Sequence, residues 1–121
     1  MRVRESEEMY LETILLLKKK GNFVRSVDIV SELDYAKSSV SRGVNLLEDK
    51  GYITIDRATG CIEFTSEGRA KAESVYERHR VITHALMKIG ADPNLAEDNA
   101  CRIEHVITEE LFVIIKEFAK K

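Results

Sequence analysis

Three side chains that could bind a metal ion lie close together late in the chain. The stretch Cys101-Arg102-Ile103-Glu104-His105 places a thiol, a carboxylate and an imidazole at positions i, i+3 and i+4. On a helix these spacings bring all three groups to one face. A thiolate and an imidazole beside one carboxylate favour a transition metal over a structural ion pair. Taken alone, the stretch fits equally well a buried cysteine followed by a surface carboxylate and a surface imidazole.

Further candidate ligands elsewhere in the chain strengthen the metal interpretation. Met9 and Glu12 are three residues apart in an N-terminal helical pattern, and His79 lies midway along a long helical segment. Met9 by itself would be interpreted as a core residue. Together these positions predict a site of mixed soft and hard ligands, formed by Met9, Glu12, His79, Cys101, Glu104 and His105.

The elements that must position these residues follow from the spacing of apolar side chains. This spacing predicts helices over residues 7–20, 27–33, 37–50, 66–89, 93–106 and 109–120. Gly21 and Gly90 follow helical patterns as stop signals, while Ser26, Asp92 and Thr108 are placed to cap helix starts. Residues 52–56 and 61–65 alternate with period two around a turn, which predicts a β-hairpin.

The order of these elements predicts a mainly α fold with two domains. A short helix, a turn over residues 34–36, a second helix and a hairpin form a winged helix-turn-helix, an arrangement typical of DNA-binding proteins. We expect this DNA-binding domain over residues 1–70. An all-helical dimerisation and metal-binding domain is expected over residues 71–121.

Basic and hydroxyl side chains gather where a winged helix-turn-helix meets DNA. Small hydroxyl residues at the start of the second helix let the backbone approach the duplex, and Lys or Arg reach phosphates or guanine edges. The predicted DNA-binding residues are Arg25, Lys37, Ser38, Ser39, Ser41, Arg42, Arg57 and Thr59, with phosphate contacts added by Arg2 and Arg4. The alternative is that the serines cap a solvent-facing helix in a protein–protein module.

Composition excludes several classes of protein. The chain has 121 residues and a formal net charge of −2, which suits one compact domain, or a small domain with an appendage, and argues against indiscriminate nucleic-acid binding. Two cysteines cannot form a disulfide framework, and Cys61 is expected to pack in a wing strand. The sequence shows neither a signal peptide nor an apolar run that could span a bilayer, so we expect a cytoplasmic protein without membrane partners.

Several stretches, in the same order along the whole chain, resemble the diphtheria toxin repressor family. These metal-dependent transcriptional repressors include the manganese transport regulator. The stretches that carry the resemblance are Glu8-Met9-Tyr10-Leu11-Glu12, Ser38-Ser39-Val40-Ser41, Thr65-Ser66-Glu67-Gly68, Arg78-His79-Arg80 and Asn99-Ala100-Cys101-Arg102-Ile103-Glu104-His105-Val106.

The resemblance implies a role for each candidate ligand. The residues that match the primary regulatory site of iron-responsive members are Met9, Cys101, Glu104 and His105. His79 matches a second-site ligand in both branches of the family, and Glu12 matches a second-site ligand in the manganese branch.

The chain also departs from the family pattern. Thr83 and Glu97 stand where iron-type members have a carboxylate and an imidazole, which leaves open how the second site is built. The third, β-barrel domain of iron-type members has no counterpart here, so we expect a short form.

The ligand types predict the metal. The manganese branch has carboxylates where this chain has Met9 and Cys101. Because a thioether and a thiolate disfavour Mn²⁺ relative to Fe²⁺, Fe²⁺ is the predicted co-repressor, with Mn²⁺ and Zn²⁺ as alternatives.

The predicted mechanism is a population shift in a homodimer. The metal-bound state fixes the two DNA-reading domains at the spacing of a palindromic double-stranded operator, about one DNA turn between half-sites. The dimer is expected because the last two helices carry apolar faces that a small appendage cannot bury alone.

Other functions remain open at this point. One is a winged-helix regulator that does not respond to metal, and another is a closed structural metal site that only supports folding. An enzyme using Cys101 as nucleophile and His105 as base is disfavoured, because the sequence shows no Gly-rich oxyanion loop and no signature of a pocket for a small-molecule substrate. His84 is expected at the surface or in an interface.

Overall fold

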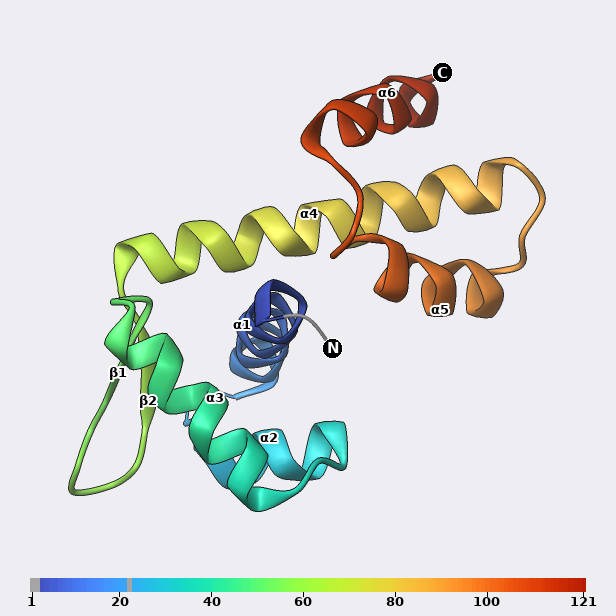
Figure 1. Ribbon diagram of the computed structural model, residues 1–121. Helices are drawn as coiled ribbons and strands as arrows, with labels where there is room; N and C mark the ends of the chain where they lie inside the picture. The colour runs from blue at the N-terminus through green and yellow to red at the C-terminus, as the bar shows by residue number, and fades with distance from the viewer. Residues whose placement is uncertain (1–2, 22) are drawn as a thin grey trace. The chain divides into compact units, whose positions relative to one another are not determined.

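The computed structural model describes the backbone of residues 3–21 and 23–121, with side chains from residue 6 onward (Figure 1). The elements in order are α1 (Val3–Lys20), α2 (Ser26–Leu33), α3 (Lys37–Asp49), β1 (Ile53–Ile55), β2 (Ile62–Phe64), α4 (Ser66–Lys88), α5 (Pro93–Ile103) and α6 (Glu109–Lys120). This order confirms the predicted mainly α class with a hairpin in the first half. The contacts divide the chain into two compact units, residues 1–73 and 74–121, with the border inside α4.

The N-terminal unit is a winged helix-turn-helix. Its core consists of apolar residues from all of its elements: Leu11, Ile14, Leu15, Val24, Ile29, Val40, Val44, Leu47, Ile53, Ile62 and Ala72. Asp34 ends α2 in the left-handed conformation, at a φ of 55°, and so forms the turn into α3. A Cβ at Gly43 would overlap the ring of Tyr10, so the absence of a side chain there lets α1 and α3 approach closely.

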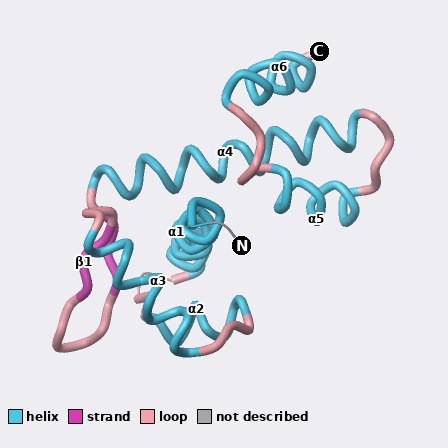
Figure 2. The backbone as a smooth tube through the Cα atoms, viewed as in Figure 1, coloured by secondary structure: helices cyan, strands magenta, loops and turns pink. Residues whose placement is uncertain are grey.

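The wing is a short antiparallel hairpin. Ile53 pairs with Phe64 and Ile55 with Ile62, so β1 and β2 are shorter than the stretches that alternate in the sequence. Backbone hydrogen bonds from Asp56 to Cys61 (2.9 Å) and from Thr65 to Tyr52 (3.0 Å) continue the pairing at both ends. The predicted hairpin is therefore confirmed, with fewer residues in regular strand geometry (Figure 2).

The C-terminal unit is helical and has its own core. Ile82 of α4, Ala100 of α5 and Phe112 of α6 form its buried centre, and half-buried residues pack around them: Val81, Leu86, Ile103, Ile107 and Ile115. The predicted caps are present, since Asp92 and Thr108 each accept a backbone N–H three residues on, from Leu95 (2.9 Å) and Leu111 (3.2 Å). Gly90, at a φ of 118°, makes the turn after α4.

The start of two helices differs from the sequence prediction. α1 begins at Val3 and not at residue 7, because an apolar pattern locates a helix end only to within a few residues. Ser26 is the first residue of α2 and not its cap; the cap position is taken by Arg25, whose backbone N–H donates to the Asp28 carboxylate at 2.9 Å. Within α2 the fully buried residue is Ile29, whereas Val27 is exposed.

The end of α5 also differs from the prediction. The helix stops at Ile103 and the chain continues as a turn through Val106. Among the described residues, no helix is long and apolar enough to cross a membrane. The domain division at residue 70 stays a prediction.

Candidate metal centre and DNA-binding surface

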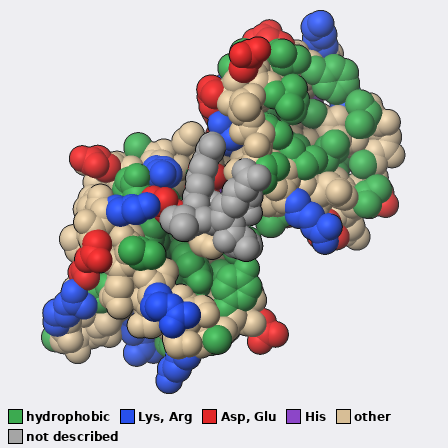
Figure 3. Space-filling view, in the orientation of Figure 1, with side chains coloured by type: hydrophobic (Ala, Val, Ile, Leu, Met, Phe, Trp, Pro, Cys, Tyr) green, Lys and Arg blue, Asp and Glu red, His purple; other side chains and the backbone are tan. Residues whose placement is uncertain are grey.

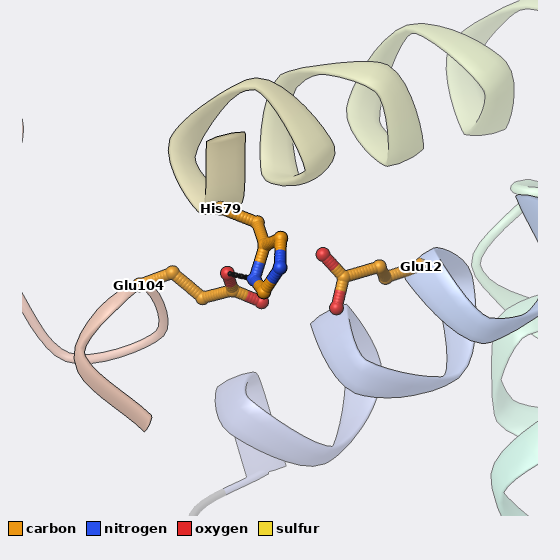
Figure 4. Close-up of side chains that lie close together, drawn as sticks. All are labelled: Glu12, His79 and Glu104. Atoms are coloured by element: carbon orange, nitrogen blue, oxygen red, sulfur yellow. Dashed lines mark hydrogen bonds and ion pairs between the residues drawn. The ribbon is translucent and has the colours of Figure 1, made fainter. Parts of the chain in front are cut away.

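A buried carboxylate lies between two imidazoles in the C-terminal unit. One oxygen of Glu104 lies 2.8 Å from Nδ1 of His79, and the other lies 3.2 Å from Nε2 of His105. Glu104 is fully buried and His105 is 4% exposed. Figure 4 shows His79, from α4, pointing toward Glu104 in the turn that follows α5; it also draws Glu12 of α1. A buried carboxylate needs compensating charge, and two imidazoles beside it form a donor set that fits a divalent transition metal.

The ring of His79 is held by its own helix and by a second carboxylate. It stacks nearly parallel to Tyr76, with 6.4 Å between ring centroids, and its Nε2 lies 3.7 Å from a carboxylate oxygen of Glu97. The hydroxyl of Thr83, one turn on, donates to the His79 carbonyl at 2.7 Å. Thr83 therefore uses its hydroxyl within α4, whereas Glu97 places a carboxylate beside the imidazole.

The turn that carries Glu104 and His105 is held by Arg78. This guanidinium is 8% exposed and donates to the backbone carbonyls of Glu104 (3.2 Å) and Ile107 (3.1 Å). It also donates to the Glu109 carboxylate at 2.7 Å and lies over the Phe112 ring. Arg78 therefore supplies hydrogen-bond donors to two backbone carbonyls of the segment after Ile103. Sequence analysis missed this role, although Arg78 stands beside His79 in the Arg-His-Arg stretch.

The prediction that Cys101, Glu104 and His105 share the face of one helix is wrong in part. Only Cys101 lies within α5, where it is exposed, while Glu104 and His105 are buried in the turn that follows. The cause is the early end of α5. Cys101 stays a predicted ligand.

The two predicted ligands of the N-terminal unit lie on α1. Glu12 is 7% exposed. Met9 is half-buried, and its sulfur accepts a hydrogen bond from the hydroxyl of Tyr35 at 3.0 Å. Met9 is therefore in polar contact, which an ordinary core methionine is not. Both remain predicted ligands.

The start of α3 presents the predicted DNA-binding side chains. Lys37, Ser38, Ser41 and Arg42 are exposed, and Ser39 is half-buried with its carbonyl accepting the Tyr10 hydroxyl at 3.4 Å. An open depression between α2 and α3 is lined by Ser26, Val27, Val30, Lys37, Ser38 and Ser41. Figure 3 shows Lys and Arg side chains at several places on the N-terminal unit.

The predicted DNA contacts outside α3 are also exposed. Arg57, at the tip of the wing, pairs with Glu48 at 2.6 Å, and the Thr59 hydroxyl accepts the Cys61 N–H at 3.2 Å. Arg25 lies over the ring of Phe23, 5.4 Å from its centroid. Arg2 lies outside the described residues, as does the side chain of Arg4.

Two models of one protein family match the chain. The iron dependent repressor N-terminal DNA binding domain matches residues 2–61, and the iron dependent repressor metal binding and dimerisation domain matches residues 65–121. The chain belongs to the iron-dependent repressor family. The resemblance predicted from the residues is thereby confirmed.

Relatives of this family differ in length from the chain. A diphtheria toxin repressor of Corynebacterium efficiens is 36% identical over 110 residues, covering 88% of this chain and 46% of the relative. The chain thus spans about half the length of the diphtheria toxin repressors that it matches. The transcriptional regulator MntR of Escherichia coli O157:H7 is 28% identical over 98% of this chain and 76% of the relative. An HTH-type transcriptional regulator of Methanocaldococcus jannaschii is 29% identical over 97% of this chain and 94% of the relative.

Several solved structures share this fold. A hypothetical protein of Sulfolobus solfataricus aligns with a TM-score of 0.70 at 27% identity, covering 98% of this chain and 88% of that one. The manganese regulator SloR aligns with a TM-score of 0.81 at 23% identity, covering 94% of this chain and 53% of the SloR chain. At that identity the likeness of SloR supports the fold alone.

Proposed function

We propose that this protein is a DNA-binding transcriptional repressor whose affinity for its operator depends on a bound divalent metal ion. The observation that carries the proposal is the buried Glu104 carboxylate between His79 and His105, in a chain whose other unit is a winged helix-turn-helix. Membership of the iron-dependent repressor family supports it. The occupancy of the metal site follows the supply of the metal, and the helix-turn-helix converts that occupancy into DNA binding.

The proposed ligands come from both units of the chain. In the N-terminal unit they are Met9 and Glu12 of α1, and in the C-terminal unit they are His79, Cys101, Glu104 and His105. When bound, the ion supplies positive charge beside the buried Glu104. His79 and His105 would bind it as neutral imidazoles, and Glu104 as a carboxylate. Glu97, 3.7 Å from His79, is placed to add a further oxygen.

We propose Fe²⁺ as the preferred ion over Mn²⁺. The soft thioether of Met9 and thiol of Cys101 support this preference, because both disfavour Mn²⁺ relative to Fe²⁺. Affinity rises further along the divalent series, so Zn²⁺ is expected to bind at least as tightly in vitro. Metal availability then decides which ion is used.

The DNA partner is proposed to be a palindromic double-stranded operator bound by a homodimer. The exposure of residues at the start of α3 and the tip of the wing supports their proposed role in phosphate and base contacts: Lys37, Ser38, Ser41, Arg42 and Arg57. The apolar residues of α6 that stay exposed support a second copy as the partner: Leu111, Val113, Ile114 and Phe118. A switch from mostly inactive to mostly active needs about 5.5 kcal/mol of differential metal binding, within reach of a site with several protein ligands.

Replacing His105 tests the proposal. We expect His105→Ala to abolish the increase in DNA affinity caused by Fe²⁺ and to leave the circular dichroism spectrum unchanged, because it removes one buried ligand from a turn outside the helices. The DNA is a duplex selected by the wild-type protein from a random pool in the presence of Fe²⁺. Affinity is measured by fluorescence anisotropy under anaerobic conditions, with and without Fe²⁺.

The matched control is His84→Ala, which removes an exposed imidazole from α4. His84→Ala should retain the wild-type response to Fe²⁺. A full response in His105→Ala would remove His105 from the site, and metal-independent DNA binding by the wild type would favour a regulator that does not sense metal.

A further inference from the structure

The sulfur of Met9 has a defined partner in the N-terminal unit. The hydroxyl of Tyr35 donates to this sulfur at 3.0 Å, although the two residues are 26 positions apart in the sequence. Both side chains are half-buried. Tyr35 belongs to the turn between α2 and α3, so this contact joins α1 to the helix-turn-helix. Thioether sulfur is a weak acceptor, and a tyrosine hydroxyl at a protein surface can usually bond to water instead.

The direction of the Tyr35 hydroxyl is set by the packing of its ring. The ring stands edge-on to Tyr10, at 84° and with 6.3 Å between centroids. Tyr10 is 6% exposed, and its hydroxyl donates to the Ser39 carbonyl at 3.4 Å. Tyr10 in turn lies against Gly43 of α3. Tyr35 thus contacts two consecutive residues of α1: its ring packs against Tyr10, and its hydroxyl bonds to the sulfur of Met9.

A fixed hydroxyl beside a methionine sulfur changes what that sulfur can do. Methionine has three rotatable side-chain bonds, and a metal must immobilise them when it binds the thioether. A hydrogen bond that already holds the sulfur in one orientation reduces this entropic cost. The bond uses one sulfur lone pair and leaves the other available. Partners of this kind commonly orient metal ligands in proteins.

We propose that Tyr35 is a positioning residue of the metal site, which holds the Met9 thioether in the orientation that binds the metal. This inference rests on the proposed function, in which Met9 is a ligand. It assigns to the turn before α3 a direct influence on metal affinity. It also predicts that the effect is larger for Fe²⁺ than for Mn²⁺, because the harder ion gains less from a thioether.

The test removes the Tyr35 hydroxyl and keeps its ring. Wild type, Tyr35→Phe, Met9→Leu and Tyr52→Phe are compared as full-length proteins, with circular dichroism as a check on folding. Methionine labelled with ¹³C in its methyl group gives few signals, since the chain has 3 methionines, and the signal lost in Met9→Leu is that of Met9. Fe²⁺ and Mn²⁺ affinities are measured by anaerobic calorimetric titration.

We expect Tyr35→Phe to shift the Met9 methyl signal of the metal-free protein. The variant should bind Fe²⁺ about 3- to 10-fold more weakly, the range for one lost hydrogen bond, with a smaller change for Mn²⁺. Tyr52→Phe loses a hydroxyl in the same unit that accepts from Lys71 at 3.3 Å, and should match the wild type.

Two results overturn the inference in distinguishable ways. If Met9→Leu weakens Fe²⁺ binding and Tyr35→Phe does not, Tyr35 has no positioning role and the proposed metal site stands. If Met9→Leu binds Fe²⁺ as the wild type does, Met9 is not a ligand, and this part of the proposed site falls together with the inference.

Discussion

At the scale of single residues, Arg78 connects three parts of the C-terminal unit. Its guanidinium bonds to the carbonyls of Glu104 and Ile107 and pairs with Glu109, a carboxylate that is largely exposed. The two carbonyls belong to the turn that presents Glu104 and His105. Their geometry therefore depends on a side chain that is not itself a proposed ligand.

Replacing Arg78 should destabilise the protein even without metal. Arg78→Met leaves the buried Glu104 carbonyl and the part-buried Ile107 carbonyl without this donor, and we expect a loss of about 2–4 kcal/mol in the free energy of unfolding. Arg80→Met, which changes an exposed residue of the same helix, should stay within about 0.5 kcal/mol of the wild type. Urea unfolding of the metal-free proteins measures both, and equal stabilities would contradict the structural role of Arg78.

Residue spacing predicted part of this site and missed the rest for a physical reason. The i+3 and i+4 spacing of Glu104 and His105 from Cys101, and the family resemblance of His79, identified the three groups that the structure brings together. Arg78 could not be identified in the same way, because an arginine beside Arg80 resembles one more surface cation. Its burial depends on Phe112 and Glu109, about thirty residues away in the sequence.

At the scale of elements, local signals predicted most boundaries. Asp34, Gly90, Asp92 and Thr108 act where the sequence places them, since turns and caps depend on a few adjacent residues. The end of α5 could not be predicted this way, because the pattern continues to Val106 and the turn after Ile103 is held by α4. Tertiary contacts override local propensity at this point.

The close approach of α1 and α3 gives a prediction about these two helices. Alanine usually stabilises a helix relative to glycine by about 0.5–1 kcal/mol. At Gly43 we expect the opposite, a loss of about 1–3 kcal/mol from overpacking, because a Cβ would overlap the Tyr10 ring. Gly21→Ala is the control, since nothing lies within 4 Å of its added Cβ. Thermal unfolding compares the two, and a Gly43→Ala variant as stable as the wild type would refute the tight contact.

At the scale of the whole molecule, α6 leaves apolar side chains in contact with solvent. Ile114 is 60% exposed and Val113 is 50% exposed, on a helix whose Phe112 is buried in the core of its own unit. The family match to a metal binding and dimerisation domain gives this surface a proposed partner in a second copy of the chain.

A charge at this surface should separate the copies. We expect Ile114→Glu to convert a dimer into a monomer and to weaken binding to the selected duplex, because two linked half-site contacts become one. Metal binding by each chain should persist. Glu117→Gln, on the same helix and exposed, should remain dimeric. Sedimentation equilibrium measures the mass, and an unchanged mass for Ile114→Glu would place the interface elsewhere.

The central claim is that the chain binds a divalent metal around the buried Glu104 carboxylate, with Fe²⁺ preferred. The most direct test is anaerobic calorimetric titration of the metal-free, folded protein with Fe²⁺ and separately with Mn²⁺, repeated for Glu104→Gln. The account predicts at least one equivalent of Fe²⁺ per chain, tighter binding of Fe²⁺ than of Mn²⁺, and loss of this binding in Glu104→Gln. Absence of binding by the wild type, or unchanged binding by Glu104→Gln, would contradict it.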